Sequence, residues 1–173
     1  MKHNENSRVK IPALVHLTRL GYEYLSLKDY RGEVHADTNI FVEIFRGSIS
    51  RINGKTLSER DAATLISELS VKLSNEDLGK AFYNILLNGI NGIRLIDFEN
   101  SSRNTYHVVT ELTYRNGDDE FRPDIILLIN GMPLSFVEVK KPNNKDGIIA
   151  EHNRINSRFS RKVFRRFVNI TQL

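Results

Sequence analysis

Two apolar runs on either side of an Asn-Gly dipeptide constrain the fold of this chain more than any other feature. Residues 121–129 and 134–140 are both rich in Ile, Leu, Val and Phe, and Asn130-Gly131 lies between them. Asn-Gly between apolar runs is a strong β-hairpin signal, because both residues tolerate the left-handed backbone of a tight turn. The pattern therefore predicts a hairpin of two strands over these two ranges.

Three charged residues lie toward the open end of this hairpin. If residues 130–131 form the turn, Asp124 lies opposite Val137, and a four-residue loop places it opposite Val139. In either register Asp124 lies beside Glu138. Because side chains alternate along a strand, Glu138 and Lys140 share one face. We therefore expect Asp124, Glu138 and Lys140 to converge.

This charged cluster has the composition of a divalent-cation site. Two close carboxylates repel each other, and a bound cation removes that penalty. Mg²⁺ prefers hard oxygen ligands, so Asp124, Glu138 and the backbone carbonyl of Val139 are the candidate metal ligands. Lys140 is then placed to orient an attacking water or to stabilise charge on a phosphate. The alternative is a structural ion pair between Asp124 and Lys140, since a lone Glu-x-Lys on a strand usually contributes little.

The remaining patterns predict a single α+β domain over residues 1–173, with a sheet flanked by helices. Apolar residues at helical spacing occupy residues 12–20, 40–49, 58–73 and 74–88, so the part over about 1–90 is helical. Alternation over Tyr106–Tyr114 predicts a further strand, in a strand-rich part over about 91–173. A helix is predicted over 147–159, and Glu111 reads as a sheet-face ion pair.

Composition and charge limit where this chain works and what it binds. It has no cysteine, which excludes disulfides and thiolate metal sites. The polar N-terminus and the lack of an apolar run of roughly 18 residues predict a cytoplasmic protein. Nine Lys or Arg and only two acidic residues occupy positions 140–173. A local basic excess favours a polyanion, and a solvated helix face is the alternative. The candidate DNA-backbone contacts are Lys141, Arg154, Arg158, Arg161 and Lys162.

Several motifs resemble one known family. Arg122-Pro-Asp124, Asn130-Gly-Met-Pro-Leu and Val137-Glu-Val-Lys-Lys-Pro-Asn-Asn144 closely resemble the N-terminal nuclease domain of the R (HsdR) subunit of type I restriction enzymes, of the PD-(D/E)xK nuclease superfamily. The resemblance extends to Leu20-Gly-Tyr-Glu-Tyr near the start and to residues 164–173 at the end. It covers essentially the whole chain.

The resemblance implies a restriction-endonuclease-like mixed sheet and Mg²⁺-dependent cleavage of double-stranded DNA, remote from the recognition sequence. Asp124 and Glu138 match the metal-binding carboxylates of the family, and Lys140 matches its catalytic lysine. Full-length members continue into an ATP-dependent DNA-translocating motor. They assemble with modification (methyltransferase) and specificity subunits, and sequence recognition is delegated to another subunit.

The chain departs from the family in two respects. It ends at Leu173 without a GxxxxGK[ST] phosphate loop, so we expect an N-terminal fragment of a longer motor protein, with ATP bound only in the absent motor region. It also lacks the Gln-x-x-x-Tyr motif that many members carry on the helix after the lysine. Asn153 or Asn156 offers at most a partial substitute. Two rival functions stay open: a non-catalytic DNA-docking or motor-docking module, and another nuclease of the superfamily.

Overall fold

The computed structural model describes residues 6–75, 77, 79–116, 119–140, 145–160 and 171–172, and it has the predicted α+β fold. A short π-helical segment, Asn6–Lys10, leads into the first helix. The helices are α1 (Ile11–Arg19), α2 (Val42–Asn53), α3 (Glu59–Leu73), α4 (Lys80–Asn88) and α5 (Lys145–Ser160). The strands are β1 (Glu23–Tyr24), β2 (Tyr106–Thr110), β3 (Tyr114–Asn116), β4 (Asp119–Phe121), β5 (Ile125–Ile129), β6 (Met132–Val137) and β7 (Thr171–Gln172).

The main sheet is mixed, in the order β1-β2-β5-β6-β7. Its two inner pairs, β2–β5 and β5–β6, are antiparallel, whereas the outer pairs β1–β2 and β6–β7 are parallel. The short strands β3 and β4 form a separate antiparallel hairpin. The predicted hairpin around Asn130-Gly131 is therefore the centre of the sheet.

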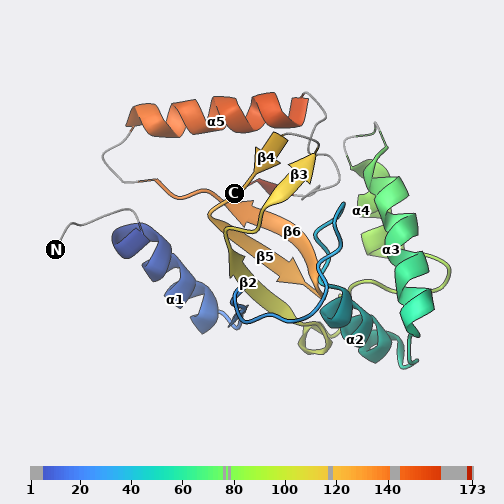
Figure 1. The fold of residues 1–173 in the computed structure, drawn as a ribbon. Helices are drawn as coiled ribbons and strands as arrows, with labels where there is room; N and C mark the ends of the chain where they lie inside the picture. The colour runs from blue at the N-terminus through green and yellow to red at the C-terminus, as the bar shows by residue number, and fades with distance from the viewer. Residues whose placement is uncertain are drawn as a thin grey trace.

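Helices cover both faces of this sheet (Figure 1). Helix α1 packs on one face, where its apolar residues meet the buried side chains of Val108, Ile125 and Val139. The opposite face carries a core of Phe41, Val109, Phe121 and Phe136 among others, and Ile155 of α5 packs against it. Each strand can contribute to both cores because its successive side chains point to opposite faces.

The turn end of the β5–β6 hairpin is anchored in the helical part of the chain. Helices α2, α3 and α4 form a core of their own that also takes in Met132 and Leu134 of β6. Asn130 is fully buried, and its side-chain amide donates to the carbonyl of Leu95 and to Asn104 Oδ1, both at 2.8 Å. Gly131 has φ +79°, and an added Cβ would lie 2.7 Å from the backbone nitrogen of Phe45. The turn of the hairpin is therefore fixed by hydrogen bonds of Asn130 and by the close packing of Gly131 against the backbone of Phe45.

The helix predictions are confirmed at several termini. Ser58 Oγ caps α3 by accepting from the backbone N–H of Asp61, at 3.1 Å. Helix α2 continues to Asn53, beyond the predicted end at residue 49, and Gly54 ends it in the left-handed conformation (φ +62°). Helix α4 begins at Lys80, later than the predicted start at residue 74. Its N-cap is Gly79, and Asp77, which precedes the helix, accepts from the backbone N–H groups of Gly79 and Ala81.

Three predicted strands were too long, and the one over residues 134–140 ends at Val137. The prediction over Tyr106–Tyr114 is wrong beyond Thr110, because Glu111 takes a left-handed backbone (φ +57°) that ends β2. The prediction over residues 121–129 is wrong near its start, since residues 122–124 separate β4 from β5. Pro123 lies in that gap, and proline cannot donate to a strand ladder. Both interruptions fall next to Asp124.

Candidate active site

A β-bulge sets the register that joins the two carboxylates. At the turn, Ile129 pairs with Met132 and Leu128 with Pro133, which by itself would bring Asp124 opposite Val137. The register shifts between Leu127 and Leu128, so that Ile125 pairs with Val137 instead. Continued by one residue, this register places Asp124 opposite Glu138. The extra residue of the bulge therefore aligns the two carboxylates.

Asp124 and Glu138 interact directly in a partly buried site. The Glu138 side chain is 11% exposed and that of Asp124 is 30% exposed. Burial, the nearby charge of Asp124 and a hydrogen bond between the two carboxyl groups raise the pKa of Glu138 to about 7. The backbone N–H of Val139 donates to Asp124 Oδ2 at 3.0 Å, which fixes one oxygen of that carboxylate. Without a cation, Glu138 therefore retains its proton more readily than an ordinary carboxyl group.

Lys140 joins the site beside Glu138. Its Nζ lies 4.0 Å from Glu138 Oε2 and 3.2 Å from Glu151 Oε2. Neither ion pair that Lys140 makes in the described part of the chain involves Asp124. The proposed alternative of a structural pair between Asp124 and Lys140 is therefore absent from this arrangement.

Helix α5 contributes a residue that the sequence analysis did not single out. Glu151 is buried, with its side chain 7% exposed, and it contacts both Lys140 and Arg154. It lies on the helix where the family carries Gln-x-x-x-Tyr, whereas Asn153 and Asn156 are exposed there. Its only signal in the sequence was that it is one of two acidic residues in the basic stretch over residues 140–173.

A second lysine approaches the site from the start of α1. Lys10 is 6% exposed, and its Nζ lies 2.6 Å from Glu111 Oε1 and 3.7 Å from Asp124 Oδ1. The hydrogen bond and charge of Lys10 lower the pKa of Glu111 below its ordinary value. The predicted ion pair at Glu111 is thus confirmed, but its partner comes from 101 residues away in the chain and has no sequence signature.

The donor set fits Mg²⁺. Among the described residues there is no cluster of three or more His, Cys, Asp or Glu side chains arranged to hold a metal ion. Mg²⁺ does not require one, since it usually binds through one or two carboxylates together with water and substrate phosphate. Burial and the charge of Asp124 raise the pKa of Glu138, and a bound cation would relieve this penalty on its charged form.

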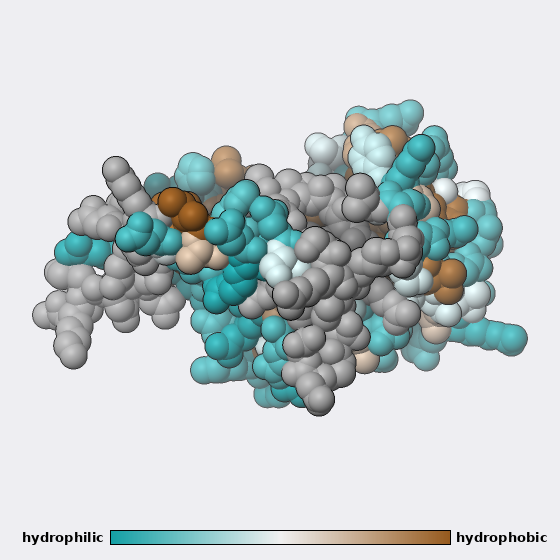
Figure 2. Space-filling view, turned by 90° about the horizontal axis from the view of Figure 1, so that it is seen from above, coloured by the Kyte–Doolittle hydropathy of each residue, from teal (hydrophilic) through white to brown (hydrophobic). Residues whose placement is uncertain are grey.

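The candidate DNA-binding residues are only partly described. Arg154 is half exposed on α5 and is bonded to Glu151 through its guanidinium. Lys141, Arg161, Lys162 and the side chain of Arg158 lie outside the described residues. The described surface seen from the α5 side is mostly hydrophilic, with only small apolar patches (Figure 2). No helix within the described ranges is both long and apolar enough to cross a membrane.

The fold and the site together define an α+β protein in which two carboxylates and a lysine meet at the open end of a central hairpin. Phosphoryl-transfer enzymes use such paired carboxylates to bind Mg²⁺. Residues 2–173 match the family described as "Type I restriction enzyme R protein N terminus (HSDR_N)", and the chain belongs to this family.

Two relatives illustrate the membership. The chain is 32% identical to the putative type I restriction enzyme MjaIXP endonuclease subunit of Methanocaldococcus jannaschii over 83% of its length. It is 30% identical to the type I restriction enzyme HindI endonuclease subunit of Haemophilus influenzae over 80% of its length. The matches span only 16% and 15% of those two proteins.

Proposed function

We propose that this chain is the endonuclease domain of a type I restriction-modification R subunit, and that it hydrolyses DNA phosphodiester bonds with Mg²⁺. The observation that carries the proposal is the register of the β5–β6 hairpin, which places Asp124 opposite Glu138 with Lys140 beside them. The names of the relatives, as endonuclease subunits of type I restriction enzymes, support the same function.

In this proposal each residue has a separate task. Asp124 and Glu138 hold the metal, with the backbone carbonyl of Val139 as a further ligand. The metal would polarise the scissile phosphate and lower the pKa of the attacking water. Lys140 orients that water, and Glu151 positions Lys140 through the 3.2 Å ion pair. This fold would then be a restriction-endonuclease-like, PD-(D/E)xK domain.

The partners follow from the same proposal. Double-stranded DNA is the substrate, and Lys141, Arg154, Arg158, Arg161 and Lys162 contact its phosphates. The domain works in the cytoplasm as the N-terminal part of a longer polypeptide, beside modification and specificity subunits. ATP binds only in the motor region of that polypeptide.

Metal binding tests the proposal without requiring the motor. In titration calorimetry, wild type is expected to bind Mg²⁺ or Mn²⁺, while Asp124→Asn and Glu138→Gln lose at least about tenfold in affinity. Glu99→Gln, which removes an exposed carboxylate far from the site, is the matched control and should bind as wild type does. Lys140→Met should retain the metal and lose cleavage in the assembled enzyme.

A DNA-docking module without catalysis predicts a different result. Such a module would bind duplex DNA equally well with Mg²⁺ or with EDTA, and its carboxylates would not bind the metal. If wild type shows no metal binding even with a DNA duplex present, the nuclease proposal is wrong.

A further inference from the structure

The ammonium group of Lys10 occupies an unusual place for a lysine. Lysine is rarely buried, because an ammonium taken out of water must be compensated by opposite charge. Here Lys10 is 6% exposed, and its two carboxylate partners, Glu111 and Asp124, both lie at the candidate metal site. A residue from the start of α1 therefore supplies a fixed positive charge to the centre of the site.

The two partners of Lys10 need a cation between them. Thr110 pairs with Ile125, and the backbone N–H of Glu111 donates to the carbonyl of Asp124, at 3.3 Å. Glu111 and Asp124 are thus neighbours across adjacent strands, where like charges destabilise a sheet. The left-handed backbone of Glu111 (φ +57°) is uncommon for a residue other than glycine. The side chain it carries holds Lys10 at 2.6 Å.

Both oxygens of Asp124 have a partner in this arrangement. Oδ2 accepts from the backbone N–H of Val139 at 3.0 Å, and Oδ1 lies 3.7 Å from Lys10 Nζ. The contact to Lys10 is the longer of the two, and it involves the oxygen that is free of backbone hydrogen bonds in the described contacts. A divalent cation that binds Asp124 must therefore compete with the charge of Lys10.

We propose that Lys10 is the resident cation of this site, which neutralises Asp124 until a divalent metal takes its place, and that Glu111 keeps Lys10 within reach. The inference rests on the proposed metal-dependent function. When the metal binds, the ammonium of Lys10 keeps its 2.6 Å partner, Glu111, and gives up only the 3.7 Å contact to Asp124. Lys10 thus acts through Asp124: it holds that carboxylate neutralised in the absence of metal, and it lowers the affinity of the site for the metal.

Two variants with opposite expected effects test this inference. Lys10→Met is expected to tighten Mg²⁺ binding by about tenfold, because a positive charge close to a metal ligand is removed. Glu111→Gln is expected to weaken it by about threefold, because Lys10 then pairs with Asp124 alone. Both affinities are measured by calorimetry. Lys72→Met removes a lysine charge from the exposed face of α3 and should leave the affinity unchanged.

A purely structural role of Lys10 gives a different pattern, in which both variants weaken metal binding or change nothing. Either result would overturn the inference while leaving the proposed function intact, provided that wild type binds the metal. If Lys10→Met does not fold, Lys10→Gln takes its place, because glutamine removes the charge and can still donate a hydrogen bond to Glu111. Lys10→Gln should also tighten metal binding, and weaker or unchanged binding by that variant would be the contrary result.

A cycle of unfolding experiments separates this inference from the proposed function. In EDTA, Lys10→Met is expected to destabilise wild type more than it destabilises Asp124→Asn, and saturating Mg²⁺ should remove the difference. If wild type binds no metal, the nuclease proposal fails at that step. A coupling that persists unchanged in Mg²⁺ would make Lys10 an ordinary ion-pair partner, contrary to the inference.

Discussion

Replacing Glu138 by Gln is expected to stabilise the metal-free protein at alkaline pH. Burial and the neighbouring Asp124 raise the pKa of Glu138 from 4.5 to about 7, and a shift of that size corresponds to about 3 kcal/mol. The Glu138 side chain is only 11% exposed, so solvent screens this repulsion weakly. Glutamine has the shape of the protonated acid and can donate to Asp124 without carrying a charge.

The sign of the effect depends on pH. The folded state binds the Glu138 proton more tightly than the unfolded state, so the contribution of Glu138 to the stability of wild type falls as pH rises from about 4.5 to about 7. The difference between Glu138→Gln and wild type should therefore be near zero at pH 4 and reach about 3 kcal/mol at pH 8. Urea unfolding in EDTA, followed by circular dichroism, measures it, since the chain has no tryptophan.

Glu99→Gln is the control for this measurement, because it removes a carboxylate that is 90% exposed. It should leave the pH dependence of wild type unchanged. Adding Mg²⁺ at pH 8 should stabilise wild type and leave Glu138→Gln almost unaffected, since metal bound only to the native state adds to its stability. If Glu138→Gln is no more stable than wild type at pH 8, the two carboxylates do not meet as described and the argument fails.

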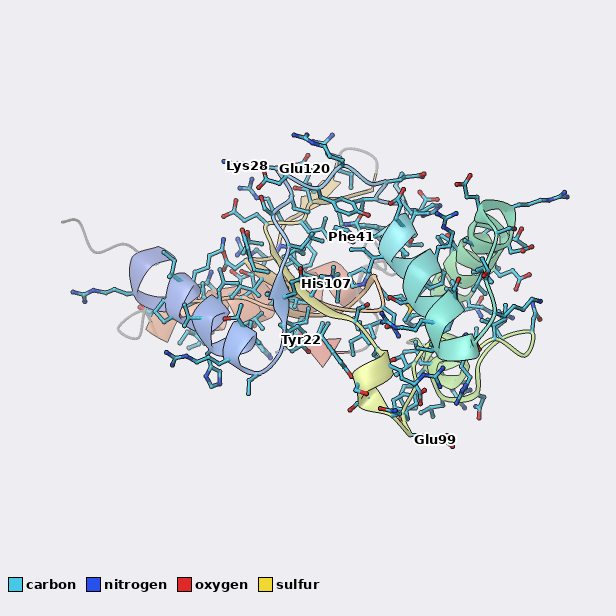
Figure 3. The ribbon with its side chains drawn as sticks, turned by 90° about the horizontal axis from the view of Figure 1, so that it is seen from below. Tyr22, Lys28, Phe41, Glu99, His107 and Glu120 are labelled. Carbon is cyan, nitrogen blue, oxygen red and sulfur yellow. The ribbon has the colours of Figure 1, made fainter. Side chains whose placement is uncertain are left out.

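Three further variants test other parts of the structure. Gly131→Ala should destabilise the fold by about 3 kcal/mol, because its Cβ would meet the backbone of Phe45, whereas Gly54→Ala, with φ +62° and open space, should cost about 1 kcal/mol; equal losses in urea unfolding would contradict this. His107 lies near the middle of the sheet (Figure 3), where burial lowers its pKa, so its folded state resists protonation and stability falls as pH drops below about 6.5. His107→Leu should flatten that loss and exposed His16→Gln should not; a loss that persists in His107→Leu would assign it to another group. Glu151→Gln should reduce DNA cleavage in the assembled enzyme by about tenfold with little change in metal affinity, and an equal loss of both would make Glu151 a metal ligand instead.

The sequence predicted the centre of the site because that information is local. Asn130-Gly131 identifies the turn, and the alternation of side chains then places Glu138 and Lys140 on one face. Asp124 lies at a similar distance on the other side of the turn, so any plausible register brings it near Glu138. The α+β class was predictable for the same reason, since each helix or strand depends mainly on residues close in the chain.

The register and the residues around the centre were not predictable in this way. The pairing register shifts between Leu127 and Leu128 of β5, which leaves one extra residue on the partner strand β6. The alternation of apolar residues in β6 does not indicate this shift. Lys10 reaches the site through tertiary packing of α1 against the sheet, across a separation of 101 residues. Glu151 depends on how α5 crosses the opposite face. Each of these depends on how the elements pack, which local patterns do not encode.

The two ends of the β5–β6 hairpin differ in what they contribute: the turn contributes packing and hydrogen bonds, and the open end carries the charged residues of the candidate site. At the turn, Asn130 and Gly131 are locked into the helical core with their polar groups satisfied. At the open end, burial and the nearby charge of Asp124 disfavour the charged form of Glu138. The packing of the turn of the β5–β6 hairpin into the core of α2, α3 and α4 holds the two strands together against the repulsion between Asp124 and Glu138. A cation that binds at the open end therefore gains affinity, because it removes the electrostatic penalty on the charged form of Glu138. The packing of the rest of the fold already offsets that penalty in the absence of the cation.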